Sequence, residues 1–180
     1  PAPLYLWANP FKGTFVEAMG ALEADGAAPV SCGFGGCVRA GTGHAAVRGE
    51  AVARGLALVA DAAAQVAPLA VGGWPGGIVV DVAAGRGTKT AQIQAASVSA
   101  GGSCALFALD VHDFKAQVLR RRMRDLAVPG VTALVGDARR LESVEGLPSR
   151  TSVDAVMLDA PCSGLGSLRR RPEKRWRLAP

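Results

Sequence analysis

Between residues 75 and 160, short apolar segments alternate with longer segments of helical character. The expected strands lie at 77–82, 104–110, 131–135 and 153–158, and the expected helices at 88–99 and 112–126. Strands rich in β-branched residues that are separated by helices are typical of a parallel sheet with right-handed crossovers. The pattern therefore predicts an α/β fold with a doubly wound, Rossmann-like sheet.

The first 50 residues follow another pattern. A strand is expected at 4–7, a helix at 14–24 and a Gly-rich hairpin at 29–40. We therefore predict a small α+β appendage over residues 1–50 and a second domain over 51–180. The Ala-rich segment 51–70 is expected to form a single packing helix that leads to the first strand of the second domain.

Several classes of protein fit the composition poorly. No apolar stretch reaches the roughly 18 residues of a membrane helix, and no secretion signal is evident. Four cysteines in 180 residues do not form a disulfide scaffold, which favours a reducing cytoplasm. Cys32 and Cys37 with His44 are a candidate for part of a metal site, but their spacing favours ordinary loop packing, so no metal is expected.

The positive charge is concentrated at one end of the sequence. Residues 169–180 contain six basic residues and one acid, so they account for the whole net charge of +5. A polyphosphate chain is the natural partner of such a patch, whereas a solvated tail is the alternative. A second basic run, 120–124, is expected to be a solvated helix face.

Each expected strand ends in or near an aspartate, and the first is followed by a Gly-rich loop. The four residues are Asp81, Asp110, Asp137 and Asp159. Asp110 comes 23 residues after Gly87, close to the offset at which an acid meets ribose hydroxyls in doubly wound folds. A dinucleotide would prefer a third glycine where Thr90 stands, and its pyrophosphate would be repelled by the acids. S-adenosylmethionine, which is cationic and has no phosphate, suits acidic strand ends better.

The last expected strand runs into the hexapeptide 159–164, Asp-Ala-Pro-Cys-Ser-Gly. It places the carboxylate of Asp159 and the thiol of Cys162 near the carboxyl end of a buried strand, where ligands bind in open α/β sheets. A thiol can attack an electron-poor carbon and later leave. Taken alone, a turn-capping Asp159 and a packed Cys162 explain the hexapeptide equally well.

Four motifs resemble those of RNA cytosine-5 methyltransferases, and most of all the bacterial enzymes that methylate small-subunit ribosomal RNA. They are Asp81-Val-Ala-Ala-Gly-Arg-Gly-Thr-Lys-Thr90, Gly136-Asp-Ala-Arg139, Leu158-Asp-Ala-Pro-Cys-Ser-Gly-Leu-Gly166, and Arg169-Arg-Arg-Pro172 with Lys174-Arg-Trp176. The resemblance covers about residues 56–178, and the first 50 residues loosely resemble the family's RNA-binding appendage.

The resemblance implies a cofactor site for S-adenosylmethionine. Asp110 would bind the ribose, Asp137 the adenine side, and Asp159 would lie near the methyl group and the base. The methionine side would be held by the loop residues Ala83, Ala84, Gly85, Arg86, Gly87, Thr88 and Lys89. Gly85-Arg86 stands where the family usually has Ala-Pro, so Arg86 either clashes with the cofactor or points outward. Thr88 is a second departure, at a position where the family often has glycine.

The resemblance also implies the chemistry. Carbon 5 of cytosine becomes nucleophilic after a thiolate adds to carbon 6, and in this family the attacking cysteine follows a threonine. None of the four cysteines here follows a threonine, and Cys162 matches the cysteine that assists product release. Asp159 would contact the base, and Lys89 would either orient Asp159 or be a surface residue at a helix start. Catalytic roles are therefore expected for Cys162, Asp159 and Lys89.

The target base must be unstacked before it can react, and phosphate contacts can offset that cost. The expected RNA contacts are Arg169, Arg170, Arg171, Lys174, Arg175 and Trp176, the last as a stacking platform or else a core anchor. Two alternatives stay open: a non-catalytic RNA-binding module with this fold, and a DNA cytosine-5 methyltransferase that attacks with Cys162. Because four strands would leave an apolar edge, we expect a longer protein or a partner that covers the edge.

Overall fold

The structure, a computed structural model, describes residues 3–160 together with Glu173 and Trp176. The first unit is an antiparallel sheet with helices packed on it, and its strand order is β2-β3-β1-β4. Its elements are β1 (Leu4–Ala8), α1 (Phe15–Ala24), β2 (Pro29–Ser31), β3 (Cys37–Ala40), α2 (Gly43–Arg48), α3 (Glu50–Ala53) and β4 (Ala57–Val59).

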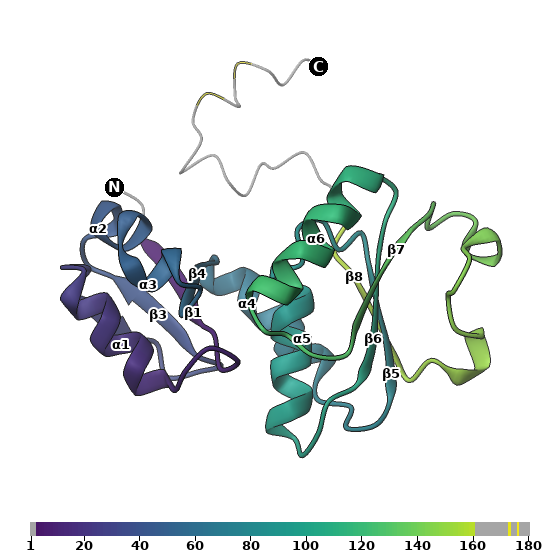
Figure 1. The fold of residues 1–180 in the computed structure, drawn as a ribbon, viewed down its shortest axis with the longest axis horizontal. Helices are drawn as coiled ribbons and strands as arrows, with labels where there is room; N and C mark the ends of the chain where they lie inside the picture. The colour runs from purple at the N-terminus through teal and green to yellow at the C-terminus, as the bar shows by residue number, and fades with distance from the viewer. Residues whose placement is uncertain (1–2, 161–172, 174–175, 177–180) are drawn as a thin grey trace.

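The second unit is a parallel sheet with strand order β7-β6-β5-β8. Its elements are α4 (Ala62–Val71), β5 (Ile78–Val82), α5 (Thr88–Ser99), β6 (Ala105–Asp110), α6 (Asp113–Asp125), β7 (Val131–Val135), the 3-10 helices η1 (Leu141–Ser143) and η2 (Arg150–Ser152), and β8 (Ala155–Leu158). Helices α5 and α6 lie on the face of the sheet toward the first unit, and the segment with η1 and η2 lies on the opposite side (Figure 1). The predicted α/β methyltransferase-type fold with an N-terminal α+β unit is confirmed.

The order of the strands reverses the direction of winding between β5 and β8. The chain steps outward from β5 through β6 to β7 and then returns to the other side of β5 as β8. In open α/β sheets, ligands bind outside the carboxyl ends of the strands where the direction of winding reverses. Here that point lies between β5 and β8, so residues that follow these two strands meet there.

The segment 51–70 does not form the single helix that we expected. Helix α3 ends at Ala53, β4 follows, and α4 begins only at Ala62. Gly55 has φ +75°, and a Cβ there would lie 2.9 Å from Leu126 Cδ2, so the chain turns and passes close to the second unit at this point. Asp61 then caps α4, because its carboxylate accepts from the amide of Ala63.

Strand β4 also extends the first unit beyond the expected boundary at residue 50. It pairs antiparallel with β1, with Trp7 opposite Leu58. The first sheet therefore includes residues 57–59. Helix α1 is where the sequence predicts it, since Thr14 and Glu17 form a reciprocal capping box at its start.

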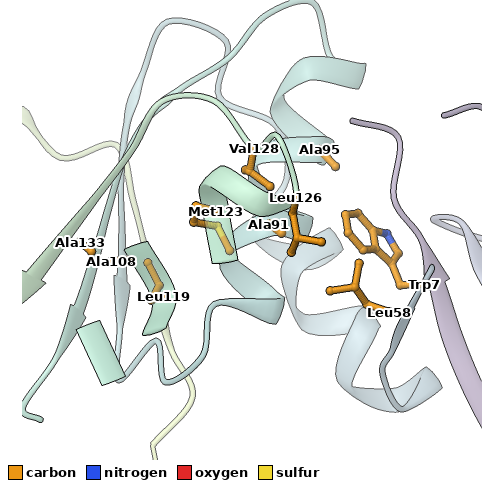
Figure 2. Close-up of a cluster of buried hydrophobic side chains, with 10 residues drawn as sticks. All are labelled: Trp7, Leu58, Ala91, Ala95, Ala108, Leu119, Met123, Leu126, Val128 and Ala133. Carbon is orange, nitrogen blue, oxygen red and sulfur yellow. The ribbon is translucent and has the colours of Figure 1, made fainter. Parts of the chain in front are cut away.

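The two units share a hydrophobic core. Trp7 and Leu58 of the first sheet face Ala91, Ala95 and Leu126 of the second unit (Figure 2). A polar contact crosses the same boundary, because Asn9, 1% exposed, donates from Nδ2 to the carbonyls of Gly55 and Leu126 at 3.0 and 3.2 Å. The units are thus held by both packing and buried hydrogen bonds.

Helix α5 buries polar as well as apolar side chains, and Gln94 joins it to two loops. Gln94 is fully buried, and its Nε2 donates to the carbonyls of Cys104 and Pro129 at 2.9 and 2.7 Å. Its Oε1 accepts from the Cys104 amide at 2.9 Å. One side chain therefore satisfies three backbone groups around the start of β6.

Strand β8 forms one edge of the described sheet. Val156 and Leu158 are 60% and 66% exposed, which agrees with the apolar edge expected from the sequence. Within the described part of the chain, no helix is long and apolar enough to cross a membrane.

Candidate functional site

The loop after β5 has an unusual backbone. Ala83, Gly85 and Gly87 all have positive φ angles, of 60°, 59° and 79°. Gly87 is required by space as well as by conformation, since a Cβ there would lie 2.9 Å from Met123 Cε and 3.0 Å from Leu119 Cγ. The loop is fixed from both sides, because Ala84 donates to the Leu109 carbonyl and Gly87 to the Ala84 carbonyl. Left-handed alanine persists only where the surroundings enforce it, and such strain is typical of functional sites.

Asp110 ends β6 and binds this loop. Its Oδ2 accepts from the amide of Gly85 at 3.1 Å, and its Oδ1 accepts from the amide of His112 at 3.0 Å. Lys115 Nζ lies 3.5 Å from Oδ1. The carboxylate is only 5% exposed and is therefore held rigidly beside the loop.

Lys89 and Asp159 meet where the sheet reverses its winding, between β5 and β8. Lys89 Nζ lies 2.6 Å from Asp159 Oδ2, and the two side chains are 25% and 56% exposed. The contact joins the start of α5 to the end of β8. Of the two alternatives for Lys89, the geometry favours a residue that orients Asp159.

Asp81 is not at the edge of the sheet with the other acids. It lies within β5, is 1% exposed, and accepts a 2.6 Å hydrogen bond from Thr90 Oγ1. Burial raises the pKa of Asp81 to about 6, although the Thr90 hydroxyl and the charge of Lys89 act in the opposite direction. The expected row of four acids is therefore three residues at the strand ends and one buried beneath them.

Asp137 lies two residues beyond β7, and its carboxylate is paired. Arg139 donates to it from the backbone amide, Nε and Nη2, at 2.6 to 3.0 Å. These hydrogen bonds lower the pKa of Asp137 to about 2. The side chain is 30% exposed, so it remains open to a further donor.

Arg86 is exposed. The carbonyl of Arg86 accepts a 2.7 Å bond from Arg122 Nη1, which also lies 3.3 Å from Thr88 Oγ1. Burial and the nearby charge of Arg86 lower the pKa of Arg122. The basic run on α6 is thus only partly a solvated face, because Arg120 also donates to a carbonyl, that of Ala133, at 2.9 Å.

Arg86, Lys115 and Arg122 line a hollow of about 460 Å³ between the loop and α6. The same hollow is bordered by Phe114, which is 64% exposed and whose ring lies 5.6 Å from that of His112. We call this surface the basic hollow. Three cations beside an exposed aromatic ring form a surface suited to an anion with a stacking group.

Several expected site residues lie outside the described residues: Cys162, Arg169, Arg170, Arg171, Lys174 and Arg175. Trp176 is 84% exposed, so it is not a core anchor. Among the residues that the structure describes, no three potential ligands gather into a metal site. Burial raises the pKa of the Cys37 thiol to about 12.

Sequence reasoning did not assign roles to Thr90, Lys115 and Arg122. Thr90 stands nine residues after Asp81, one helical turn beyond the loop, and Lys115 and Arg122 project from one helix toward the loop. The signal of Thr90 is positional, because a residue in the first turn of a helix after a Gly-rich loop can face the strand that precedes the loop. An Arg that binds a backbone carbonyl has no sequence signal of its own.

A family model described as 16S rRNA methyltransferase RsmB/F matches residues 73–180, more than half of the sequence. The chain belongs to the RsmB/F family. The match includes the loop after β5, Asp110, Asp137, and the Lys89–Asp159 pair. The resemblance inferred from the motifs is thereby confirmed.

Two other comparisons agree with RsmB/F membership. The chain is 34% identical over 128 residues to a probable ribosomal RNA small subunit methyltransferase B of Synechocystis, a match that covers 71% of this chain and 27% of that protein. The crystal structure of PH0851 matches 98% of this chain and 39% of its own, with a TM-score of 0.85 and 29% identity. The chain thus spans about a quarter of the Synechocystis relative.

The RsmB/F fold is also found at lower identity. NSun6 from Pyrococcus horikoshii, solved with SFG, has a TM-score of 0.76 and 14% identity, and the match covers 97% of this chain and 71% of NSun6. Such a match supports the fold alone. Because 97% of this chain is aligned, the arrangement of the two units is part of what the two proteins share.

Proposed function

We propose that this chain binds S-adenosylmethionine between the ends of β5 and β8 and serves the methylation of cytosine carbon 5 in ribosomal RNA, in the cytoplasm. The observation that carries the proposal is the left-handed loop 83–87 fastened to Asp110 at the point where the sheet reverses its winding. Membership of the RsmB/F family supports the same activity.

The residues at this point fit this cofactor. A Cβ at Gly85 would find only the Ala83 carbonyl, at 3.9 Å, so the loop leaves room for a ligand above it. We assign the ribose hydroxyls to Asp110, the adenine side to Asp137 and the methionine side to the loop. When bound, the cofactor supplies an electrophilic methyl group. The acids offer acceptors for its hydroxyl and amino groups and repel a pyrophosphate, which disfavours a dinucleotide.

Asp159 and Lys89 are the described residues proposed to act on the base. Lys89 holds the Asp159 carboxylate at the same point, where it can accept a hydrogen bond from the cytosine ring. Cys162, three residues later in the sequence, is assigned to product release, because the family's attacking cysteine follows a threonine and no cysteine here does. We therefore expect this chain to bind the cofactor and to show little turnover by itself.

The basic hollow supports an RNA partner. Its three cations can contact phosphates, and Phe114 offers a stacking surface beside the cofactor loop. The basic residues at 169–175 are proposed to add further phosphate contacts. The hollow includes Arg86 of the loop and Thr88 at the start of α5, so RNA bound there would lie next to the proposed methyl donor.

Calorimetry with S-adenosylmethionine tests the proposal. The wild-type chain should bind it, and Asp110→Asn should weaken binding by about tenfold or more, because the variant loses a charged acceptor and replaces it with a donor. Asp113→Asn is the matched control, since Asp113 is exposed and its carboxylate accepts a hydrogen bond from the nearby Gln117 side chain. Its affinity should equal that of the wild type.

Three outcomes would redirect the proposal. Absence of cofactor binding, together with salt-sensitive RNA binding, would favour the non-catalytic RNA-binding module. Equal affinities of the Asp110 and Asp113 variants would remove Asp110 from the site. Covalent trapping of Cys162 by fluorinated cytosine in DNA, and not in RNA, would favour the DNA methyltransferase.

Arg122 should act on the cofactor through the loop that it binds. Arg122→Met removes the hydrogen bonds to the Arg86 carbonyl and Thr88 while keeping the length of the side chain, so we expect about fivefold weaker cofactor binding. Arg121→Met is the control, because Arg121 is 79% exposed and faces Asp125. An Arg122 variant that binds as tightly as the control would show that the loop holds its shape without this contact.

A further inference from the structure

Two cysteines lie opposite each other at the closed end of the β2–β3 hairpin. The pairing of the two strands reaches Ser31 opposite Val38. Cys32 and Cys37 form the next pair, because the Cys32 amide donates to the Cys37 carbonyl at 2.9 Å. Residues paired in this way have Cα atoms about 4.5–5.5 Å apart and side chains on the same face of the sheet. A disulfide needs a Cα separation of about 4.4–6.8 Å, so the hairpin holds the two backbones at a suitable distance for one.

The two thiols also interact with each other. Burial, a hydrogen bond with the Cys32 side chain and the charge of Cys32 raise the pKa of the Cys37 thiol to about 12. Cys37 therefore keeps its proton at neutral pH. Cys37 is 1% exposed, whereas Cys32 is only half-buried. A small oxidant in solution consequently meets Cys32 first, and Cys37 needs to reach only its neighbour.

The turn between the two cysteines can absorb the small movement that a bond requires. It is the tetrapeptide Gly-Phe-Gly-Gly, and glycine has the fewest steric restrictions on its backbone angles. Strand β2 has three residues and lies at the edge of the first sheet. A covalent bond at its end would therefore hold it more firmly than its few ladder hydrogen bonds do.

We propose that Cys32 and Cys37 form a redox-sensitive site that closes to a disulfide with hydrogen peroxide and reopens with a dithiol. The Cys32 thiolate attacks one peroxide oxygen, so that a sulfur–oxygen bond forms, the oxygen–oxygen bond breaks, and the departing hydroxide takes up a proton. The Cys37 sulfur then displaces the hydroxyl group from Cys32, and its proton leaves with that group as a second water. The peroxide gains two electrons, and the cysteine pair loses two.

Such a site agrees with the reducing compartment that the composition favours, because disulfides there are usually transient and redox-sensing. The proposal does not depend on methyl transfer.

The disulfide would act on the face of the first sheet that joins the two units. Cys37 is paired with Trp7 of β1, and Trp7 is paired with Leu58 of β4, so the three side chains form a row on one face. Trp7 and Leu58 pack against the second unit (Figure 2). Oxidation should therefore stiffen the first sheet beside the shared core.

Peptide mapping of the intact 180-residue chain tests the proposal. One equivalent of hydrogen peroxide should remove the mass of two hydrogen atoms, and dithiothreitol should restore it. Trypsin followed by chymotrypsin, which cuts after Phe34, separates the two cysteines, so their peptides should stay joined only in the oxidised sample. The Cys32–Cys37 bond should be about tenfold or more as abundant as any other disulfide.

The melting temperature gives a second readout. The oxidised wild type should melt about 4–8 °C above the reduced protein, because the bond restricts the unfolded chain. Cys32→Ser keeps the size of the side chain but cannot form the bond, so peroxide should not raise its melting temperature. Val30→Ser, at an exposed position of the same strand, keeps both cysteines and should respond as the wild type does.

The proposal is overturned if one equivalent of peroxide leaves both thiols free, or if it joins Cys104 or Cys162 in place of this pair. It is also overturned if dithiothreitol does not reopen the bond, or if Cys32→Ser gains as much thermal stability from peroxide as the wild type. Each of these results is independent of the cofactor titration.

Discussion

Replacing Gln94 with leucine should lower the free energy of unfolding by about 3–5 kcal/mol. The substitution keeps the side-chain volume but removes the partners of the Cys104 amide and of the carbonyls of Cys104 and Pro129. Each buried backbone group that loses its partner costs about 1–3 kcal/mol, since water cannot reach it. Urea unfolding followed by circular dichroism measures the change.

Gln117→Leu is the matched control for this prediction. Gln117 is exposed on α6 and donates only to Asp113, so its replacement should change stability by less than about 0.5 kcal/mol. If the Gln94 and Gln117 variants unfolded at the same urea concentration, the three bonds of Gln94 would not hold α5 against β6, and the account of the buried helix would fail.

Asp81→Asn should make the protein more stable at neutral pH, by about 2–3 kcal/mol, and should leave it unchanged near pH 4. In the folded protein the pKa of Asp81 is about 6, whereas an aspartate in an unfolded chain has a pKa of 3.8. Between these values the folded chain keeps a proton that the unfolded chain has lost, so this group's contribution to stability falls as pH rises from 4 to 6. Asparagine can still accept from Thr90 and carries no charge to desolvate.

Unfolding of the wild type and the Asp81 variant should be compared at pH 4.5 and pH 7.5, with Asp113→Asn as an exposed control. The difference between wild type and variant should grow with pH, whereas the control should follow the wild type. A difference that does not change with pH would mean that Asp81 titrates normally in the folded chain. Retention of a destabilising carboxylate is common at functional sites, and Asp81 lies next to the Lys89–Asp159 pair.

Much of the second unit could be predicted because its sequence pattern and its burial agree. The strands β5, β6 and β7 and the helix α5 begin and end within two residues of the expected positions. Their parallel arrangement follows from the alternation of strand and helix. The prediction for segment 51–70 was wrong because its alanines favour a helix, whereas the pairing of β4 with β1 and the close approach of Gly55 to Leu126 are tertiary contacts without local signal.

The candidate site likewise contains some residues that could be placed from the sequence and others that could not. Acids at the carboxyl ends of strands could be predicted from the sequence, and Asp110 and Asp159 lie at or just after the ends of β6 and β8. Asp81 was misplaced because side chains alternate between the faces of a strand, and its position within β5 turns it toward Thr90 beneath the loop. Arg122 binds a backbone carbonyl 36 residues away, and such a contact depends on the fold rather than on any motif.

Asn9 has a mechanical consequence. By bonding Gly55 and Leu126 at once, its buried amide prevents the N-terminal sheet from swinging about the short connection to α4. Any partner bound to the first unit would therefore keep a constant offset from the Lys89–Asp159 pair.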